Sequence, residues 1–408
     1  MFDLISEILQ TLRHNKLRTA LTGFAVAWGI FMLIVLLGVG NGVTGSFREH
    51  AMTPGSQKIN IWPGRTSRPY HGYREGRTIS LRSADLSRVA DENRHAVREV
   101  TTTIYGPVDT LVYGTKFIRT SYTGVYPSEL KLHDEVEMEC GRFINDKDMA
   151  SRSKVMVLTR DDATNLGLPE GEGALGKQLS LSGLSFKVVG IYTSRWGRET
   201  YIPFTTARML AGNDDELGSM SVMLHNVSTA EQGDQVEADV RRTLAAAHDF
   251  DPDDTGAVWI WNQFSQGMKG LQAMNILNAS IWILGLLTLL SGVVGISNIM
   301  FVSVRERTHE IGIRRAIGAR PRSILTQIMA ESIAITTLFG YIGIVLGSVA
   351  TGIVDALFGD SDFMTHPHVD LSIAVQVTAV LILAGALAGL FPALKSLKVK
   401  PVEALRDE

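Results

Sequence analysis

Four long stretches of the chain carry no charged residue and are dominated by apolar side chains. They cover residues 19–47, 270–304, 332–354 and 371–394. A helix of about 20 apolar residues crosses a bilayer, so each stretch predicts a transmembrane helix, the third beginning at residue 321. The first stretch is too long for the hydrophobic region of a signal peptide, which has roughly 7–15 residues. We interpret it as an uncleaved signal anchor.

The basic residues indicate which side of the membrane each connecting segment occupies. They cluster before the first stretch, between the second and third, and after the fourth: Arg13, Lys16, Arg18, Arg305, Arg307, Arg314, Arg315, Arg320, Arg322, Lys395, Lys398, Lys400 and Arg406. Residues 355–370 contain four Asp and no Lys or Arg. Because short cytoplasmic loops are enriched in Lys and Arg, we expect both termini and the tail 395–408 in the cytoplasm, and 355–370 as a short periplasmic loop.

The first 18 residues have an amphipathic pattern. Phe2, Ile5, Leu9 and Leu12 recur at helical spacing, and polar residues occupy the rest of the helix surface. We predict an interfacial helix over 1–18 that lies along the inner membrane surface. The alternative is a simple extension of the first transmembrane helix.

The insertion between the first two spans, residues 48–269, has the pattern of a folded α+β domain. Strands are predicted at 58–62, 154–158, 219–224 and 258–262, hairpins within 100–126 and 178–192, and helices at 83–93 and 228–248. Strand, helix and strand at both ends predict two halves of one subdomain, with a β-rich subdomain inserted at about 113–205. We place Trp259 and Trp261 in the core, and four other aromatic residues in loops: Tyr70, Tyr73, Trp196 and Tyr201.

The predicted fold class is therefore a helical membrane protein with four transmembrane helices and a large extracytoplasmic α+β domain between helices 1 and 2. The formal net charge is −3, from 39 Lys and Arg against 42 Asp and Glu, which argues against a nucleic-acid partner. Cys140 is the only cysteine, which excludes an intramolecular disulfide and a multi-cysteine metal site.

Two motif-like sequences do not support catalysis. GEGALGK at 171–177 matches a phosphate-binding loop, but Gln178 stands where Ser or Thr would hold Mg²⁺, and a strand pattern follows. His309-Glu310 begins a zinc-protease motif, but Ile313 replaces the second His. With no nucleophile–base pair either, we expect no enzymatic activity, catalytic residue, cofactor or metal on this chain.

Small residues recur four positions apart within each span. The pairs are Gly38 and Gly42, Ser291 and Gly295, Gly343 and Gly347, and Gly385 and Gly389. Such pairs let helix backbones approach closely in lipid, either at a dimer or bundle interface or in ordinary packing within one four-helix group. Glu331, near the inner end of the third span, is a functional candidate because carboxylates in membrane segments are costly, unless it simply reaches the interface.

Residues 305–320, between the second and third spans, combine paired charges with an apolar side. The charges at four-residue spacing are Glu306, Glu310 and Arg314, and the apolar residues are Ile311, Ile313 and Ile317. A break at Gly318 and a restart at Pro321 delimit this short helix. An Arg-rich amphipathic helix on the cytoplasmic surface suits docking to a cytoplasmic partner. The alternative is that the arginines only fix the topology.

The same region carries a resemblance that extends along the chain. RERTHEIGIRRAIGARPRSILTQIMAES at 305–332 resembles the signature of the MacB/FtsX-like ABC transporter permeases, in its MacB-type form. Further elements similar to that family are NKLRTALT at 15–22, GRF at 141–143 with Asp148, GK at 176–177 with FKVVG at 186–190, FPA at 391–393, and PVEALR at 401–406.

This resemblance implies a permease subunit in the bacterial inner membrane, as a homodimer bound to two copies of an ABC ATPase. Because the chain begins almost at its first span, we expect the ATPase, with its ATP and Mg²⁺, on a separate chain. The residues implied to couple to the ATPase are Arg305, Glu306, Arg307, Glu310, Arg314 and Arg315. The outer domain would be of the porter and sabre kind, and ATPase closure would change its shape by mechanotransmission.

The function implied first is efflux of peptides, drugs or similar small molecules. It would use a tripartite assembly with a periplasmic adaptor and an outer-membrane channel. LolC/LolE-like lipoprotein release and FtsX-like signalling to a cell-wall hydrolase are the alternatives.

Overall fold

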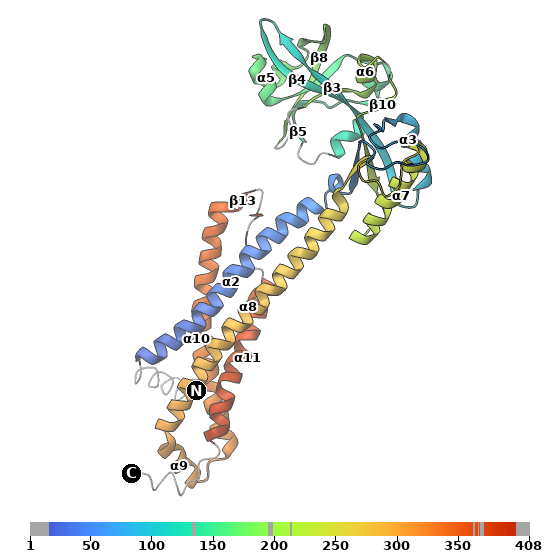
Figure 1. The fold of residues 1–408 in the computed structure, drawn as a ribbon. Coiled ribbons are helices and arrows are strands. Elements are labelled where there is room, and N and C mark those ends of the chain that lie inside the picture. The colour runs from blue at the N-terminus through green and yellow to red at the C-terminus, as the bar shows by residue number, and fades with distance from the viewer. Residues whose placement is uncertain are drawn as a thin grey trace. The chain divides into compact units, whose positions relative to one another are not determined.

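The computed structural model describes residues 16–132, 136–194, 199–212, 214–361, 364, 365, 367 and 371–396. Most of the predicted interfacial helix, Trp196 and the tail beyond residue 396 lie outside these residues. The chain divides into two compact units, Met1–Arg48 with Leu271–Glu408, and Glu49–Gly270 (Figure 1).

The first unit contains the four predicted spans as helices that are long and apolar enough to cross a membrane. They are α2 (Lys16–Ala51), α8 (Gln263–Glu306), α10 (Pro321–Phe358) and α11 (Leu371–Ser396). The short α9 (Thr308–Ala316) lies between α8 and α10. A hairpin of β13 (Asp360–Ser361) and β14 (Met364–Thr365) connects α10 to α11.

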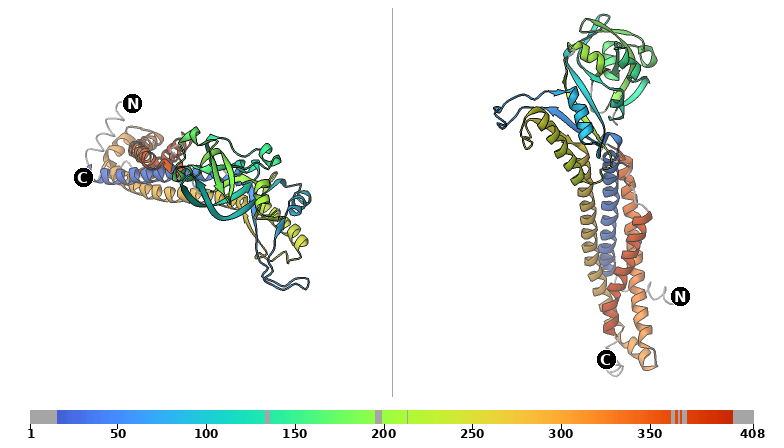
Figure 2. Two further views of the ribbon diagram at one scale, coloured as in Figure 1. Left: turned by 90° about the horizontal axis from the view of Figure 1, so that it is seen from above. Right: turned by 90° about the vertical axis from the view of Figure 1, so that its right-hand side faces the viewer.

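Helix α2 is the centre of this bundle, and Figure 2 shows it between α8 and the α10–α11 pair. Its buried face is apolar and at most 3% exposed at Val26, Ile30, Leu33, Ile34 and Leu37. The outer faces of the other helices carry exposed apolar side chains, such as those along α8. In a bilayer such apolar faces contact the lipid hydrocarbon, and each helix satisfies its own backbone N–H and C=O groups there.

The second unit is an α+β domain built on one ten-stranded sheet. The strands are β1 (Lys58–Pro63), β3 (Val97–Tyr113), β4 (Lys116–Val125), β5 (Val136–Gly141), β6 (Val155–Thr159), β7 (Gln178–Leu181), β8 (Leu184–Ser194), β9 (Thr200–Pro203), β11 (Ser219–Leu224) and β12 (Val258–Asn262). Their order is β12-β1-β11-β3-β4-β9-β6-β8-β5, and β7 pairs with β3 and β8. A separate small ladder joins β2 (Leu81–Arg82) to β10 (Glu216–Leu217).

This domain has two parts, each with its own helices. One part carries α3 (Ser83–Glu92) and α7 (Ala230–His248), and the other carries α4 (Asp146–Ala150), α5 (Arg160–Leu166) and α6 (Phe204–Leu210). Short 3-10 helices η1 (Pro54–Ser56), η2 (Pro127–Lys131) and η3 (Gly171–Ala174) complete the unit.

A single long strand, β3, belongs to both parts. Its first half pairs with β11, and from Ile104 onward it pairs with β4. The inserted subdomain therefore begins near Ile104 rather than at 113. The Gly106-Pro107 interruption shifts the register between Tyr105 and Val108, so it bends the strand instead of ending it, as a bulge does.

The aromatic residues of this domain correct three predictions. Trp259 and Trp261 are 55% and 45% exposed, not in the core. They alternate along the edge strand β12 with the buried Val258 and Asn262, so the period of 2 turns both indoles outward. Tyr201 is buried at 5% exposure, and it lies within the fully buried β9 instead of a loop.

A buried hydrogen-bonded contact joins α3 to the end of α7. His248 Nε2 lies 2.8 Å from Asp85 Oδ2, and the same carboxylate oxygen accepts a hydrogen bond from the backbone N–H of Arg82 at 2.8 Å. Burial alone would raise the pKa of Asp85, but the bonds from His248 and Arg82 outweigh it and hold that pKa below its ordinary value.

The GRF element is held in place by hydrogen bonds and a close backbone contact. Arg142 donates to both carboxylate oxygens of Asp148, at 2.5 and 3.1 Å, and Asp148 also accepts from the backbone N–H of Asn145 at 3.1 Å. Gly141 has φ +77°, and a Cβ there would lie 2.3 Å from the Val189 carbonyl oxygen. Only glycine fits this close backbone approach.

Candidate functional site

The candidate site is the junction of α8, α9 and α10. Helix α8 ends at Glu306, Arg307 interrupts the helix with φ −98° and ψ 15°, and α9 follows. Gly318 then takes a left-handed conformation with φ +100°. Pro321 is the first residue of α10, where a backbone N–H would have no partner within the helix, so proline is well tolerated. These local signals place α9 as a separate short helix between two long ones.

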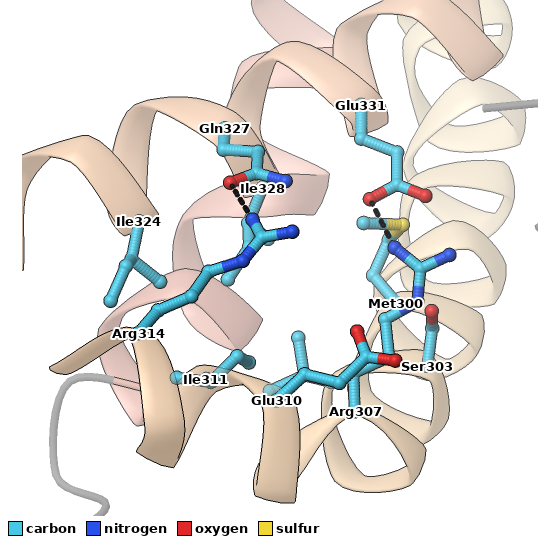
Figure 3. A pocket seen from close by; sticks show the side chains of 11 residues that line it. Met300, Ser303, Arg307, Glu310, Ile311, Arg314, Ile324, Gln327, Ile328 and Glu331 are labelled. Carbon is cyan, nitrogen blue, oxygen red and sulfur yellow. Dashed lines mark hydrogen bonds and ion pairs between the residues drawn. The ribbon is translucent and has the colours of Figure 1, made fainter. Parts of the chain in front are cut away.

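Two of the predicted coupling arginines turn toward α10. Arg307 Nη1 lies 3.7 Å from Glu331 Oε2, and Arg314 Nη1 donates to Gln327 Oε1 at 3.0 Å. Figure 3 shows both arginines reaching across to these side chains. Glu331 is only 6% exposed, so its carboxylate is buried among helices and paired with a cation.

The space between these contacts is a small pocket. It is lined by Met300, Ser303, Val304, Arg307, Glu310, Ile311, Arg314, Ile324, Gln327, Ile328 and Glu331 (Figure 3). Water-sized molecules can occupy about 30 Å³ of it, whereas sites for drug-sized ligands have about 300–1,000 Å³. The space is therefore too small to enclose a drug-sized ligand.

The end of α8 and the α9 segment carry exposed side chains. Arg305 and Glu306, the last residues of α8, are exposed, as are Glu310 and Arg314, which also line the pocket, and Arg315 is half-buried. Ile317 is 82% exposed and Ile313 is 38% exposed, while Ile311 lines the pocket. The three isoleucines do not form one apolar side, because residues two apart on a helix lie on nearly opposite faces. The sequence placed all three isoleucines on one apolar side, whereas the structure leaves Ile313 and Ile317 exposed and turns Ile311 to the pocket.

Most of the small-residue pairs contact neighbouring helices of the same chain. A Cβ on Gly343 would meet the Ala27 carbonyl oxygen at 2.5 Å, and one on Gly347 would meet Ile34 at 2.7 Å, so both abut α2. Gly38 abuts Thr351 of α10, and Gly42 abuts Met364 and Pro367.

The remaining pairs differ from one another. Gly385 and Gly389 abut α10 at Thr336 and Ser332. Ser291 is exposed and Gly295 is half-buried. Five of these glycines therefore let α2, α10 and α11 pack closely: Gly38, Gly343, Gly347, Gly385 and Gly389.

The motif-like sequences have no catalytic geometry. Residues 171–177 form η3 and a turn that leads into β7, whereas a phosphate-binding loop leads into a helix. Among the residues that the structure describes, no group of three or more His, Cys, Asp or Glu could hold a metal ion.

The four membrane helices, the α+β domain between the first and second, and the short helix between the second and third define a multi-pass membrane protein of the permease class. A family model described as MacB-like periplasmic core domain matches residues 19–243, more than half of the chain. A second model, described as FtsX-like permease C-terminal, matches residues 282–401. The chain belongs to the MacB/FtsX-like family of ABC transporter permeases.

Curated relatives cover the whole chain at low identity. The chain is 26% identical over 421 residues to the macrolide export ATP-binding/permease protein MacB of Wolinella succinogenes, which covers 100% of this chain and 61% of that protein. The protein of the same name from Marinobacter nauticus is 29% identical over 424 residues, again covering 100% and 61%. The chain thus spans about three fifths of the length of these relatives.

Two solved structures resemble part of the chain. The periplasmic region of MacB from Actinobacillus actinomycetemcomitans has a TM-score of 0.42 and 19% identity, over 54% of this chain and 94% of that one. The extracellular domain of the noncanonic ABC-type transporter YknZ from Gram-positive bacteria has a TM-score of 0.41 and 17% identity, over 50% and 99%.

Proposed function

We propose that this chain is the permease part of a MacB-type ABC transporter that couples ATP hydrolysis by an ABC ATPase to a change of shape in the domain between α2 and α8. The observation that carries the proposal is the outward face of α9. It presents the exposed Ile313 and Ile317 beside the exposed Glu310, with the exposed Glu306 at the neighbouring end of α8. An apolar patch flanked by charged groups is the composition of a protein contact surface.

The exposed face divides the predicted coupling residues into two sets. Arg305 and Glu306, the last residues of α8, are exposed and available to an ATPase, and Glu310, which also lines the pocket, is exposed as well. Arg307 and Arg314 contact α10 and hold α9 against that helix. Because α9 is attached to α10, a force that the ATPase exerts on α9 can pass to α10.

Mechanotransmission agrees with the packing of the bundle. The buried face of α2 is apolar, and glycines bring α2 and α10 into close contact. Closely packed interiors are hard to compress and transmit strain, so a displacement of one of these helices would move its neighbours. The substrates would be peptides, drugs or similar small molecules that enter a tripartite assembly from the periplasm.

The remaining partners follow from the same proposal. The chain would sit in the inner membrane with both termini in the cytoplasm and would act as a homodimer with ATP and Mg²⁺ on the ATPase. A periplasmic adaptor and an outer-membrane channel would complete the path. The exposed Trp259, which packs on Trp62 with ring centroids 4.7 Å apart, and its neighbour Trp261 offer an apolar surface for the adaptor or the substrate.

The test is gentle detergent purification of the tagged full chain, with mass spectrometry of the proteins that remain bound. An ATPase with a periplasmic adaptor is the expected result. An ATPase with a cell-wall hydrolase would favour signalling, and an ATPase with a second related permease would favour lipoprotein release. Absence of any ATPase, under conditions that preserve the dimer, would refute the role given to α9.

A further inference from the structure

Helix α9 is attached to α10 at two points that form a matched pattern. Arg307, the non-helical residue between α8 and α9, and Arg314, within α9, both reach the same stretch of α10. Their partners Glu331 and Gln327 are four residues apart on α10 and therefore share one face of that helix. The order is antiparallel, because the earlier arginine contacts the later partner.

Apolar side chains line the small pocket between the two attachments. Ile311 faces Ile324 and Ile328, which are 5% and 6% exposed. Polar contacts at both ends and apolar contact between them resist both sliding and rotation of α9 against α10. The segment Arg307–Arg314 and the segment Ile324–Glu331 thus form what we call the α9–α10 clamp.

Glu331 is the residue on which this clamp depends most. A carboxylate that is 6% exposed is stable in its charged form only when a cation or hydrogen-bond donors satisfy it. Arg307 supplies that cation from the residue where α8 ends and α9 begins. The same α10 that carries Glu331 continues as one helix to Phe358, so a force at the clamp reaches its far end.

We propose that the α9–α10 clamp is the link by which movement of α9 reaches α10, and that Glu331 is its positioning residue. The inference rests on the proposed function, in which an ATPase moves α9. It assigns Arg307 and Arg314 to transmission inside the chain instead of contact with the ATPase.

The test uses Glu331→Gln in the full chain, with Cys140→Ser to remove the native thiol. Glu331→Gln is the mildest change because it removes the buried charge and keeps the shape. Arg322→Gln is the matched control, since it removes a charge from the exposed first turn of α10. The double variant Arg307→Glu with Glu331→Arg restores opposite charges, and monodisperse elution from a sizing column shows that each variant folds.

Two measurements distinguish the integrity of the α9–α10 clamp from the action of the ATPase. Spin labels at Ala316→Cys on α9 and Ser323→Cys on α10, both exposed, report the distance between the two helices without any ATPase. A fluorophore at Leu357→Cys, 70% exposed near the far end of α10, reports the ATP-dependent movement of that helix in the presence of the co-purified ATPase.

In Glu331→Gln we expect a broader label distance and unchanged ATPase binding. The fluorescence response to ATP should fall about tenfold, a size usual for coupling between sites. The charge-reversed pair should regain most of the response, and Arg322→Gln should match the wild type. A Glu331→Gln variant with the wild-type distance distribution and the wild-type response would overturn the inference. A wild-type chain that binds no ATPase would overturn the proposed function and the transmission role, and the label distance would still decide whether the clamp exists.

Discussion

Replacing Gly343 by alanine should separate α10 from α2. The added methyl group would lie 2.5 Å from the Ala27 carbonyl oxygen and 3.0 Å from Ile30 Cβ. A backbone carbonyl in the middle of a helix cannot rotate away, so the helices themselves must move apart by about half an ångström. Gly352, on the same helix, has no atom within 4 Å of the added carbon and gives the matched control.

The size of the effect follows from two opposing contributions. Forcing a methyl group into a filled contact costs about 1–3 kcal/mol. Alanine favours a helix over glycine by up to about 1 kcal/mol, and this gain applies at both positions. With the full helix gain of about 1 kcal/mol at both positions, Gly343→Ala should lose about 0–2 kcal/mol and Gly352→Ala should gain about 1 kcal/mol, so the two variants should differ by about 1–3 kcal/mol.

The assay is thermal unfolding of the full chain in detergent, followed by intrinsic tryptophan fluorescence. We expect the Tm of Gly343→Ala to fall by a few degrees relative to Gly352→Ala. Equal Tm values for the two variants would refute close packing of α2 against α10 in the single chain. A loss of dimer at unchanged Tm would instead place Gly343 at an interface between copies.

Three further predictions concern other parts of the chain. Ile317→Glu should reduce the retained ATPase at least about tenfold without changing Tm, because a charge replaces a hot-spot contact; full retention would contradict the outward role of α9. Asp148→Ala should lower stability by about 1–3 kcal/mol, since Arg142 and the Asn145 N–H lose their acceptor. Asp146→Ala, on the exposed side of α4, should leave stability unchanged. Equal Tm values for the two variants would contradict the structural role of the Arg142–Asp148 pair. The pKa of Asp85 is lower in the folded chain than the unfolded value of about 3.9. Its stabilisation is therefore complete above that pH and is lost as pH falls through the folded pKa, so unfolding midpoints between pH 5 and pH 3 should fall less steeply in Asp85→Asn than in the wild type.

Local pattern was sufficient for the elements of the fold. The charge-free stretches marked the four membrane helices, because burial in lipid requires an unbroken apolar run. Strands such as β11 and β12 were visible because alternation and β-branched residues act over a few neighbouring positions. The break at Gly318 and the restart at Pro321 were also local, since both depend on backbone chemistry of single residues.

Long-range pairing was beyond the reach of such patterns. The sequence around Gly106 and Pro107 indicates an interruption, but only the partners of β3 show that one strand serves both parts of the domain. The direction of Trp259 and Trp261 depended in the same way on which face of β12 meets the helices. A shift of one residue exchanges the two faces of a strand, and no local signal decides it.

Four membrane helices, an α+β domain between the first two and a charged amphipathic helix between the second and third could all be predicted from the amino-acid sequence. Those properties depend on hydrophobicity, charge and spacing along the chain. The contacts that this segment makes could be read from the three-dimensional structure alone: Arg307 and Arg314 contact Glu331 and Gln327, while Ile317 stays exposed. A helix with charges and isoleucines on several faces has more than one way to pack, and the neighbouring helix α10 selects one of them.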